Sequence, residues 1–307
     1  MSIQTKIAEG GNSGETTAPR TEWGIDLKIA TKVLEVVDAG LVSGVGKPIP
    51  GQMCVEAAVC YALDLPHGDD PECVSRALRS LKIKLNDSSW SSNAARTKGL
   101  RRLALIQLGS RNHLDDKEFA KRVTELAIRK QVPIALRTTA SINKQPLHKQ
   151  ALLDAANKCE IEGSRQSAFD AREVAREARR AAYAAADAAA YAYAAAYADA
   201  ATYAAAYAAA DAAEVAAADA AADADADAAA YAAAAADVAA AAAADAAAAA
   251  AAAATTYADA ATYAAAAADA DAARDKILSD FAEDVVQILI DMKVPGVQWL
   301  PLTEVQP

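Results

Sequence analysis

Residues 181–200 read AAYAAADAAAYAYAAAYADA, and this alanine-dominated sequence continues to residue 270, with alanine at 63 of the 90 positions from 181. Alanine has the highest intrinsic helix propensity, so a long run of it forms helix in water with little help from packing. Between Gly163 and Pro295 the chain contains neither glycine nor proline. The tract therefore predicts long helices, and these decide the fold class.

Charge is divided unevenly along the chain. Residues 181–273 contain 13 acidic residues and no lysine or arginine, whereas the remainder contains 31 basic and 28 acidic residues. Such asymmetry is typical of an interaction surface, but scattered aspartates also keep an alanine surface hydrated. The formal net charge of -10 argues against a protein that coats nucleic acid along its whole length.

Composition divides the chain into four regions. Residues 1–20 are polar and predict a disordered tail that lacks the apolar segment of a secretory signal. Residues 21–163 predict a helical body, 164–274 an Ala-rich low-complexity tract, and 275–307 a C-terminal helix and tail packed on the body. Charge-free apolar runs are shorter than the ~20 residues that span a membrane. Because the chain has four cysteines and no signal, we expect a cytoplasmic protein with reduced thiols and no membrane partner.

Apolar residues recur at helical spacing throughout the body, and nothing reads as strands alternating with turns. Typical helix starts are an Asp70–Pro71 pair, Ser92 or Asn93, and Asp115 or Asp116, and Pro133 is expected to interrupt the chain. The predicted helices cover about residues 25–37, 52–63, 72–85, 93–108, 116–130, 134–140 and 147–161. We therefore predict an all-α fold.

The segment 276–292 is rich in large apolar residues and predicts a helix that needs a packing partner. If it packs on the body, the tract must leave the body and return, whereas one straight helix of about 110 residues would extend about 165 Å. We predict an antiparallel helical hairpin that turns within residues 219–227, where aspartates cluster. A second break at Thr255–Thr256 would give a shorter bundle.

Three groups of residues could support chemistry, but none has the pattern that its chemistry requires. The first is a set of candidate zinc ligands: Cys54, Cys60, His67 and Cys73. Their spacing lacks a C-x-x-C pair and does not place the first two on one helix face. Glu56 with His67 or Asp69 has no adjacent nucleophile, and the glycines of residues 40–48 are wrongly spaced for a phosphate-binding loop. We predict a non-enzymatic protein with no catalytic residue, metal or cofactor.

A basic edge is the candidate interaction site. It consists of Arg96, Lys98, Arg101, Arg102 and Arg111. The preceding predicted helix is also basic, so residues 72–111 could form a helix-turn-helix. The linking loop of about seven residues is longer than that motif has, and no aromatic residues are interleaved as in single-strand binders. Alternatively, this edge meets acidic groups of the tract or of a partner protein.

The tract is similar in composition to the alanine-rich helical antifreeze proteins of fish, but its threonines do not follow their eleven-residue spacing. It also resembles the alanine repeats punctuated by Asp and Tyr in many uncharacterised bacterial proteins, which implies a bacterial or phage origin and no activity. From residue 183 to 231 nearly every fourth residue is Tyr, Asp or Val. Such a degenerate repeat is either a helix-packing surface or the expansion of a short DNA unit.

Taken together, these features predict a structural or protein-interaction protein. The Ala-rich rod would space, dock or oligomerise, with a second copy or another protein as its partner. The first alternative is a nucleic-acid-associated or regulatory binder acting through residues 72–111, and the second is ice binding by the tract.

Overall fold

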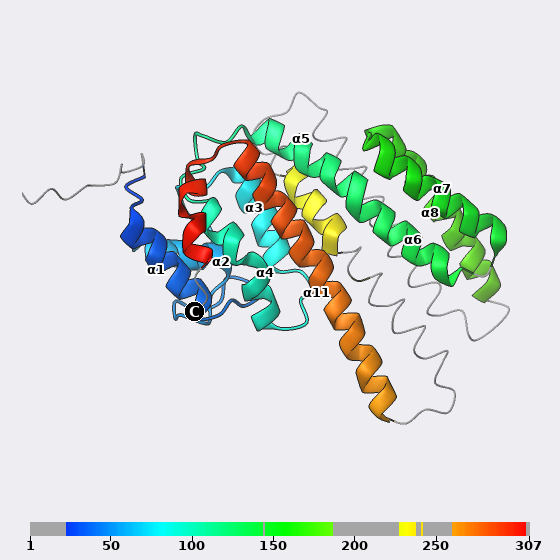
Figure 1. Cartoon of the computed structure of the whole chain (residues 1–307), viewed down its shortest axis with the longest axis horizontal. Coiled ribbons are helices and arrows are strands. Elements are labelled where there is room, and N and C mark those ends of the chain that lie inside the picture. Colours follow the sequence, from blue (N-terminus) through cyan, green and yellow to red (C-terminus); the bar gives the residue numbers. More distant parts are fainter. Residues whose placement is uncertain (1–22, 144, 187–226, 238–240, 242–259, 305–307) are drawn as a thin grey trace, which may run out of the picture.

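The computed structural model describes residues 23–143, 145–186, 227–237, 241 and 260–304 (Figure 1). Within these ranges the chain is helical and has no β-strand, which confirms the predicted all-α fold. Isolated bridges join Leu41 and Gly46 to Met53. The helices are α1 (Leu27–Asp38), α2 (Val55–Ala62), α3 (Arg76–Asn86), α4 (Asn93–Ile106), α5 (Asp116–Leu126), η1 (Ala127–Gln131), α6 (Val132–Ile142), α7 (Pro146–Glu162), α8 (Arg165–Ala186), α11 (Ala260–Asp291) and η2 (Pro295–Thr303).

Side-chain caps fix most helix starts. Of the two candidates predicted for each cap, Ser92 caps α4 and Asp115 caps α5, each accepting a hydrogen bond from a backbone N–H of the first turn. The predicted start at Asp70 is wrong. The cap of α3 is Ser75, and the Asp70 carboxylate instead lies 3.3 Å from the guanidinium of Arg79.

A π-helical turn joins α5 to α6. The N–H of Val132 donates to the carbonyl of Ala127, five residues earlier, so α5, η1 and α6 form one continuous rod (Figure 1). The predicted interruption at Pro133 is therefore wrong. Pro133 is the second residue of α6, directly after the π turn, and the helical rod continues through it although proline offers no N–H donor.

The long helix α11 packs along α4. Phe281, Val285 and Leu289 are fully buried on its inner face. At Gly99 of α4, an added Cβ atom would lie 3.0 Å from the hydroxyl oxygen of Ser279 in α11 and 2.3 Å from the Trp90 ring, so both approach the α4 backbone closely. The 3₁₀ helix η2 follows α11 and packs against α4 and α1, as the continuous red segment of Figure 1 shows.

Helices α7 and α8 form a pair at the far end of the rod (Figure 1). Gly163 ends α7 in the left-handed conformation at φ 57°, as its position after the predicted helix indicates. The guanidinium of Arg129 pairs with Glu125 of α5 and also donates to the last α7 carbonyls, those of Glu160, Ile161 and Glu162. Arg129 thereby fixes the end of α7 to the rod.

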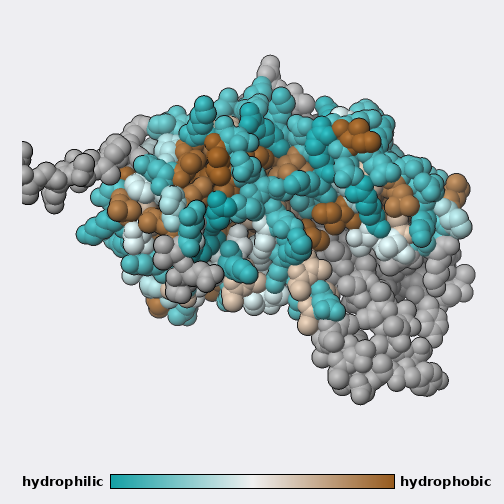
Figure 2. Space-filling model, in the orientation of Figure 1, coloured by the Kyte–Doolittle hydropathy of each residue, from teal (hydrophilic) through white to brown (hydrophobic). Residues whose placement is uncertain are grey.

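Part of the alanine tract lies against the body. Residues 227–237 form an unlabelled helix, coloured yellow in Figure 1. Five of its alanines belong to the hydrophobic core: Ala229, Ala232, Ala233, Ala235 and Ala236. Most of the predicted turn at 219–227 and the break at Thr255–Thr256 lie outside the described residues, as does most of the tract that would form the two arms. Among the described helices, none combines the length and apolarity that crossing a membrane requires. The face of the molecule seen in Figure 2 is mostly hydrophilic, with hydrophobic residues in separate patches.

Candidate interaction surfaces

The predicted basic edge does not form one surface, and Arg96 is the clearest exception. Its side chain is buried, and Nε donates to the carbonyl of Asn86 at 2.7 Å. The guanidinium also donates to the side-chain oxygen of Asn93. Burial lowers the pKa of Arg96, while the nearby charge of Asp87 raises it. Arg96 therefore fastens the end of α3 to the start of α4 and cannot contact an external partner.

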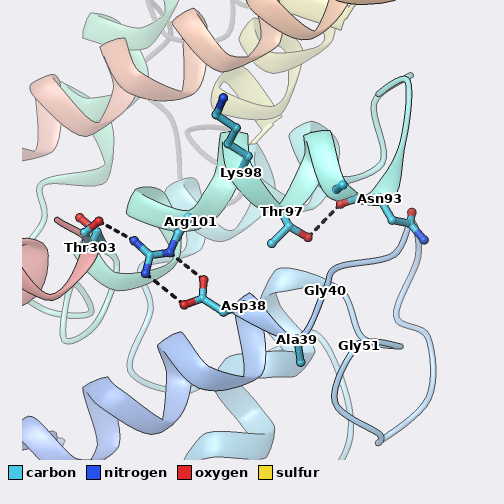
Figure 3. A pocket seen from close by; sticks show the side chains of 10 residues that line it. Asp38, Ala39, Gly40, Gly51, Asn93, Thr97, Lys98, Arg101 and Thr303 are labelled. Atoms are coloured by element: carbon cyan, nitrogen blue, oxygen red, sulfur yellow. Dashed lines mark hydrogen bonds and ion pairs between the residues drawn. The ribbon is translucent and has the colours of Figure 1, made fainter. Parts of the chain in front are cut away.

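Arg101 joins three elements. Nε lies 2.6 Å from Oδ1 of Asp38 in α1, and the second terminal nitrogen lies 3.0 Å from Oδ2 (Figure 3). The remaining terminal nitrogen donates to the carbonyl of Thr303 in η2. A bidentate, largely buried pair of this kind holds α1, α4 and η2 together.

The other three residues of the basic edge, Arg102, Arg111 and Lys98, have different surroundings. Arg102 forms an ion pair with Glu283 of α11. Arg111 lies beyond α4, where its side chain donates to the carbonyl of Val74 at 3.4 Å. Lys98 is exposed. Of the five predicted residues, Lys98 is thus the one whose charge is presented mainly to solvent.

A groove of about 780 Å³ runs beside Arg101 (Figure 3). Its walls come from the end of α1, the loop between α1 and α2, one face of α4 and the end of η2. Among the residues that line it are Asp38, Gly40, Gly51, Asn93, Thr97, Lys98 and Thr303. The Thr97 hydroxyl accepts from the N–H of Leu41 at 2.8 Å and fixes the loop to α4. The volume suits a small ligand, but the Arg101–Asp38 pair already satisfies the strongest charges in the groove.

Two aspartates, Asp237 and Asp275, accept hydrogen bonds from the loop at residues 88–92. The loop at residues 88–92 donates from Ser89 N to Asp237 Oδ1 at 2.9 Å. It also donates from Ser91 N to Asp275 Oδ1 at 2.9 Å, and the Ser91 hydroxyl donates to the second oxygen of Asp275. One short loop therefore receives carboxylates from both the 227–237 helix and α11.

Glu56 has a partner that spacing did not indicate. Its carboxylate lies 2.8 Å from Nζ of Lys82 in α3, and both side chains are completely buried. Asp69 instead binds Arg79, and the His67 ring lies 3.2 Å from the carbonyl of Gly46. Burial raises the pKa of Glu56, which Lys82 opposes, and burial lowers the pKa of Lys82. The only sequence signal was a glutamate in an otherwise apolar helix.

The cysteines are buried free thiols. Burial raises the pKa of Cys60 to about 12 and those of Cys73 and Cys159 to about 11, so they stay protonated at neutral pH. Across the described ranges, no group of His, Cys, Asp and Glu side chains is arranged to hold a metal ion.

Comparison with known proteins gave no match to a family model, a curated protein or a solved structure.

Proposed function

We propose that this chain is a non-enzymatic interaction protein, in which a helical body binds alanine-rich helices of the kind carried by its own tract. The observation that carries the proposal is the helix at 227–237, which packs against the body through alanine side chains and is joined to it by the Asp237–Ser89 hydrogen bond.

The packed face of this helix is broad. Ala228, Ala229, Ala232, Ala233, Ala235 and Ala236 are all buried. At 100° per residue these positions cover about 160° of the helix circumference. Tyr231 lies outside this sector and is 44% exposed. Small side chains let two helices approach closely. The shape of the alanine face and the Asp237–Ser89 hydrogen bond therefore determine how this helix packs on the body.

The same docking sequence occurs a second time in the tract. Residues 227–237 read DAAAYAAAAAD, and residues 259–269 read DAATYAAAAAD, with a single difference. In the second copy Ala268 and Asp269 are exposed, although the equivalent Ala236 is buried and Asp237 binds Ser89. The second copy is thus a candidate ligand for the body of another molecule, which supports self-association.

Alanine-mediated packing also recurs inside the chain. Ala168, Ala171, Ala175 and Ala178 of α8 form a buried stripe in the pair with α7. The nucleic-acid alternative gains no comparable support, because Arg96, Arg101 and Arg102 are engaged within the protein. The free buried cysteines agree with the proposed cytoplasmic location.

A peptide competition tests the proposal. Ala233→Leu enlarges a buried side chain and should displace the 227–237 helix, whereas Ala230→Leu changes a half-exposed position of the same helix and serves as the matched control. A fluorescent peptide of residues 255–272 should bind the Ala233→Leu chain more tightly than the wild type or the control. The same peptide carrying Ala265→Leu should not bind. If the peptide binds none of the three chains, the body is not a receptor for this helix.

A further inference from the structure

A second cleft lies between the π turn η1 and α11. Its volume is about 250 Å³, and it is lined by Lys130, Gln131, Ile134, Ile277, Asp280, Glu283 and Asp284. Ile134 and Ile277 supply apolar surface, while the other residues are charged or polar. The lining therefore combines an apolar wall with three carboxylates and one ammonium.

Both walls follow from the local backbone. The π turn widens the helical rod by one residue at its junction with α6 and turns Lys130 and Gln131 toward α11. On α11, Ile277, Asp280 and Asp284 follow one another at steps of three and four residues and share one face. π turns inside α-helices are often found at functional sites, and this one forms a wall of the cleft.

Gln131 is an unexplained polar group in this cleft. Its side chain is 2% exposed, and Oε1 has no hydrogen-bond partner among the described residues. A buried carbonyl oxygen without a donor costs about 1–3 kcal/mol, so such groups are uncommon in folded proteins. The missing donor is the first indication that the cleft accepts a ligand.

The cleft contains the ammonium group of one of its own residues, Lys130. Nζ of Lys130 lies 2.7 and 2.8 Å from the two oxygens of Asp284. Glu283 and Asp280 pair with Arg102 and Lys276, which do not line the cleft. Each carboxylate has about four acceptor sites and so retains some for a further donor.

We propose that this cleft binds an alkylguanidinium group. The apolar wall would contact the aliphatic stem, and the guanidinium would donate to Asp280, Glu283 and Gln131 Oε1. A planar guanidinium is favoured over a second ammonium because it is more weakly hydrated and its fork matches a carboxylate and a carbonyl together. The group belongs either to a free small molecule or to an arginine side chain of another protein.

Calorimetric titration of the full chain with three probes tests the site. The probes are agmatine, the capped tripeptide Gly-Arg-Gly, and N-butylurea, which is planar and similar in length but uncharged. Agmatine or the tripeptide should bind, and butylurea should not. Tighter binding of the tripeptide assigns the site to arginine side chains, and tighter binding of agmatine assigns it to a free molecule.

Four variants assign the binding to this cleft. Asp280→Asn and Gln131→Leu should each weaken binding about three- to tenfold, through the lost charge and the lost acceptor. Lys130→Met should strengthen it, because it removes the resident ammonium from a side chain that is 54% exposed and tolerates change. Asp291→Asn, on the exposed end of the same helix, should leave the affinity unchanged. Absence of binding by both cationic probes, or equal effects of Asp280→Asn and Asp291→Asn, would overturn the proposal.

Discussion

The carboxylate of Glu56 and the ammonium of Lys82 lie 2.8 Å apart in the core of the body, and neither side chain is exposed to solvent. Two ions in such surroundings stabilise one another only as a pair, because removal of either leaves an uncompensated charge away from water. This pair links α2 to α3. Replacing one of the two residues should therefore destabilise the protein much more than replacing both with apolar residues.

Lys82→Met should therefore destabilise the protein by about 3–5 kcal/mol, whereas Glu56→Leu combined with Lys82→Met should restore much of that loss. Urea denaturation of the two single variants and the double variant measures the difference. A double variant as unstable as the sum of the single variants would show that the ions are not coupled.

The Lys82→Met variant should also become less stable as the pH rises. Burial raises the pKa of Glu56 above 4.5, and this variant removes the lysine that opposes the rise. A carboxyl group with a higher pKa in the folded state contributes stability below pH 4.5, which is lost as the pH rises through the folded-state pKa. The urea midpoint of the variant should fall between pH 4.5 and pH 8 more steeply than that of the wild type.

Gly99→Ala should displace Trp90. The new Cβ atom would lie 2.3 Å from the indole ring, and relieving that overlap should cost about 1–3 kcal/mol. Because Trp90 belongs to the loop that binds Asp237 and Asp275, its fluorescence should shift in the folded protein. Gly68→Ala is the matched control, since a Cβ atom there would meet only one backbone oxygen, at 4.0 Å.

Phe281→Ala should destabilise the body by about 3–5 kcal/mol, because the ring is fully buried where α11 packs in the core. Gln287→Ala, at an exposed position of the same helix, should change stability little. Thermal unfolding of both variants provides the comparison. An unchanged melting temperature for Phe281→Ala would mean that α11 is not part of the cooperative unit.

The four thiols should resist alkylation in the folded protein. All are buried, and the pKa of Cys60 is raised to about 12, so little thiolate is present at pH 8. Iodoacetamide followed by mass spectrometry should detect four modifications in urea and essentially none without it. Rapid modification of the native chain would show that the thiols are reached through frequent opening.

Local chemistry made much of the fold predictable. Helical periodicity, the caps Ser92 and Asp115, and the terminal Gly163 act within a few residues, so the sequence shows them directly. The π turn was missed because Pro133 normally marks a helix boundary, and only the continuous rod reveals that it is tolerated in the first turn of α6.

The interaction residues were less predictable because their partners are distant in sequence. Arg101 contacts Asp38 and Thr303, which lie 63 and 202 residues away. A basic helix face looks the same in sequence whether its charges are paired by other elements or left for a partner. The alanines at 227–237 were likewise indistinguishable from their neighbours until one segment was seen against the body.

The loop at residues 88–92 holds Asp237 and Asp275 at once, so both ends of the sequence between them are fastened to one place on the body. The entropic cost of closing a chain between two anchors rises only logarithmically, by about 0.6 kcal/mol for each doubling of length. Whole alanine repeats could therefore be gained or lost between these anchors over evolutionary time with little effect on folding. Natural variants should differ in length there while keeping both aspartates and the serine loop.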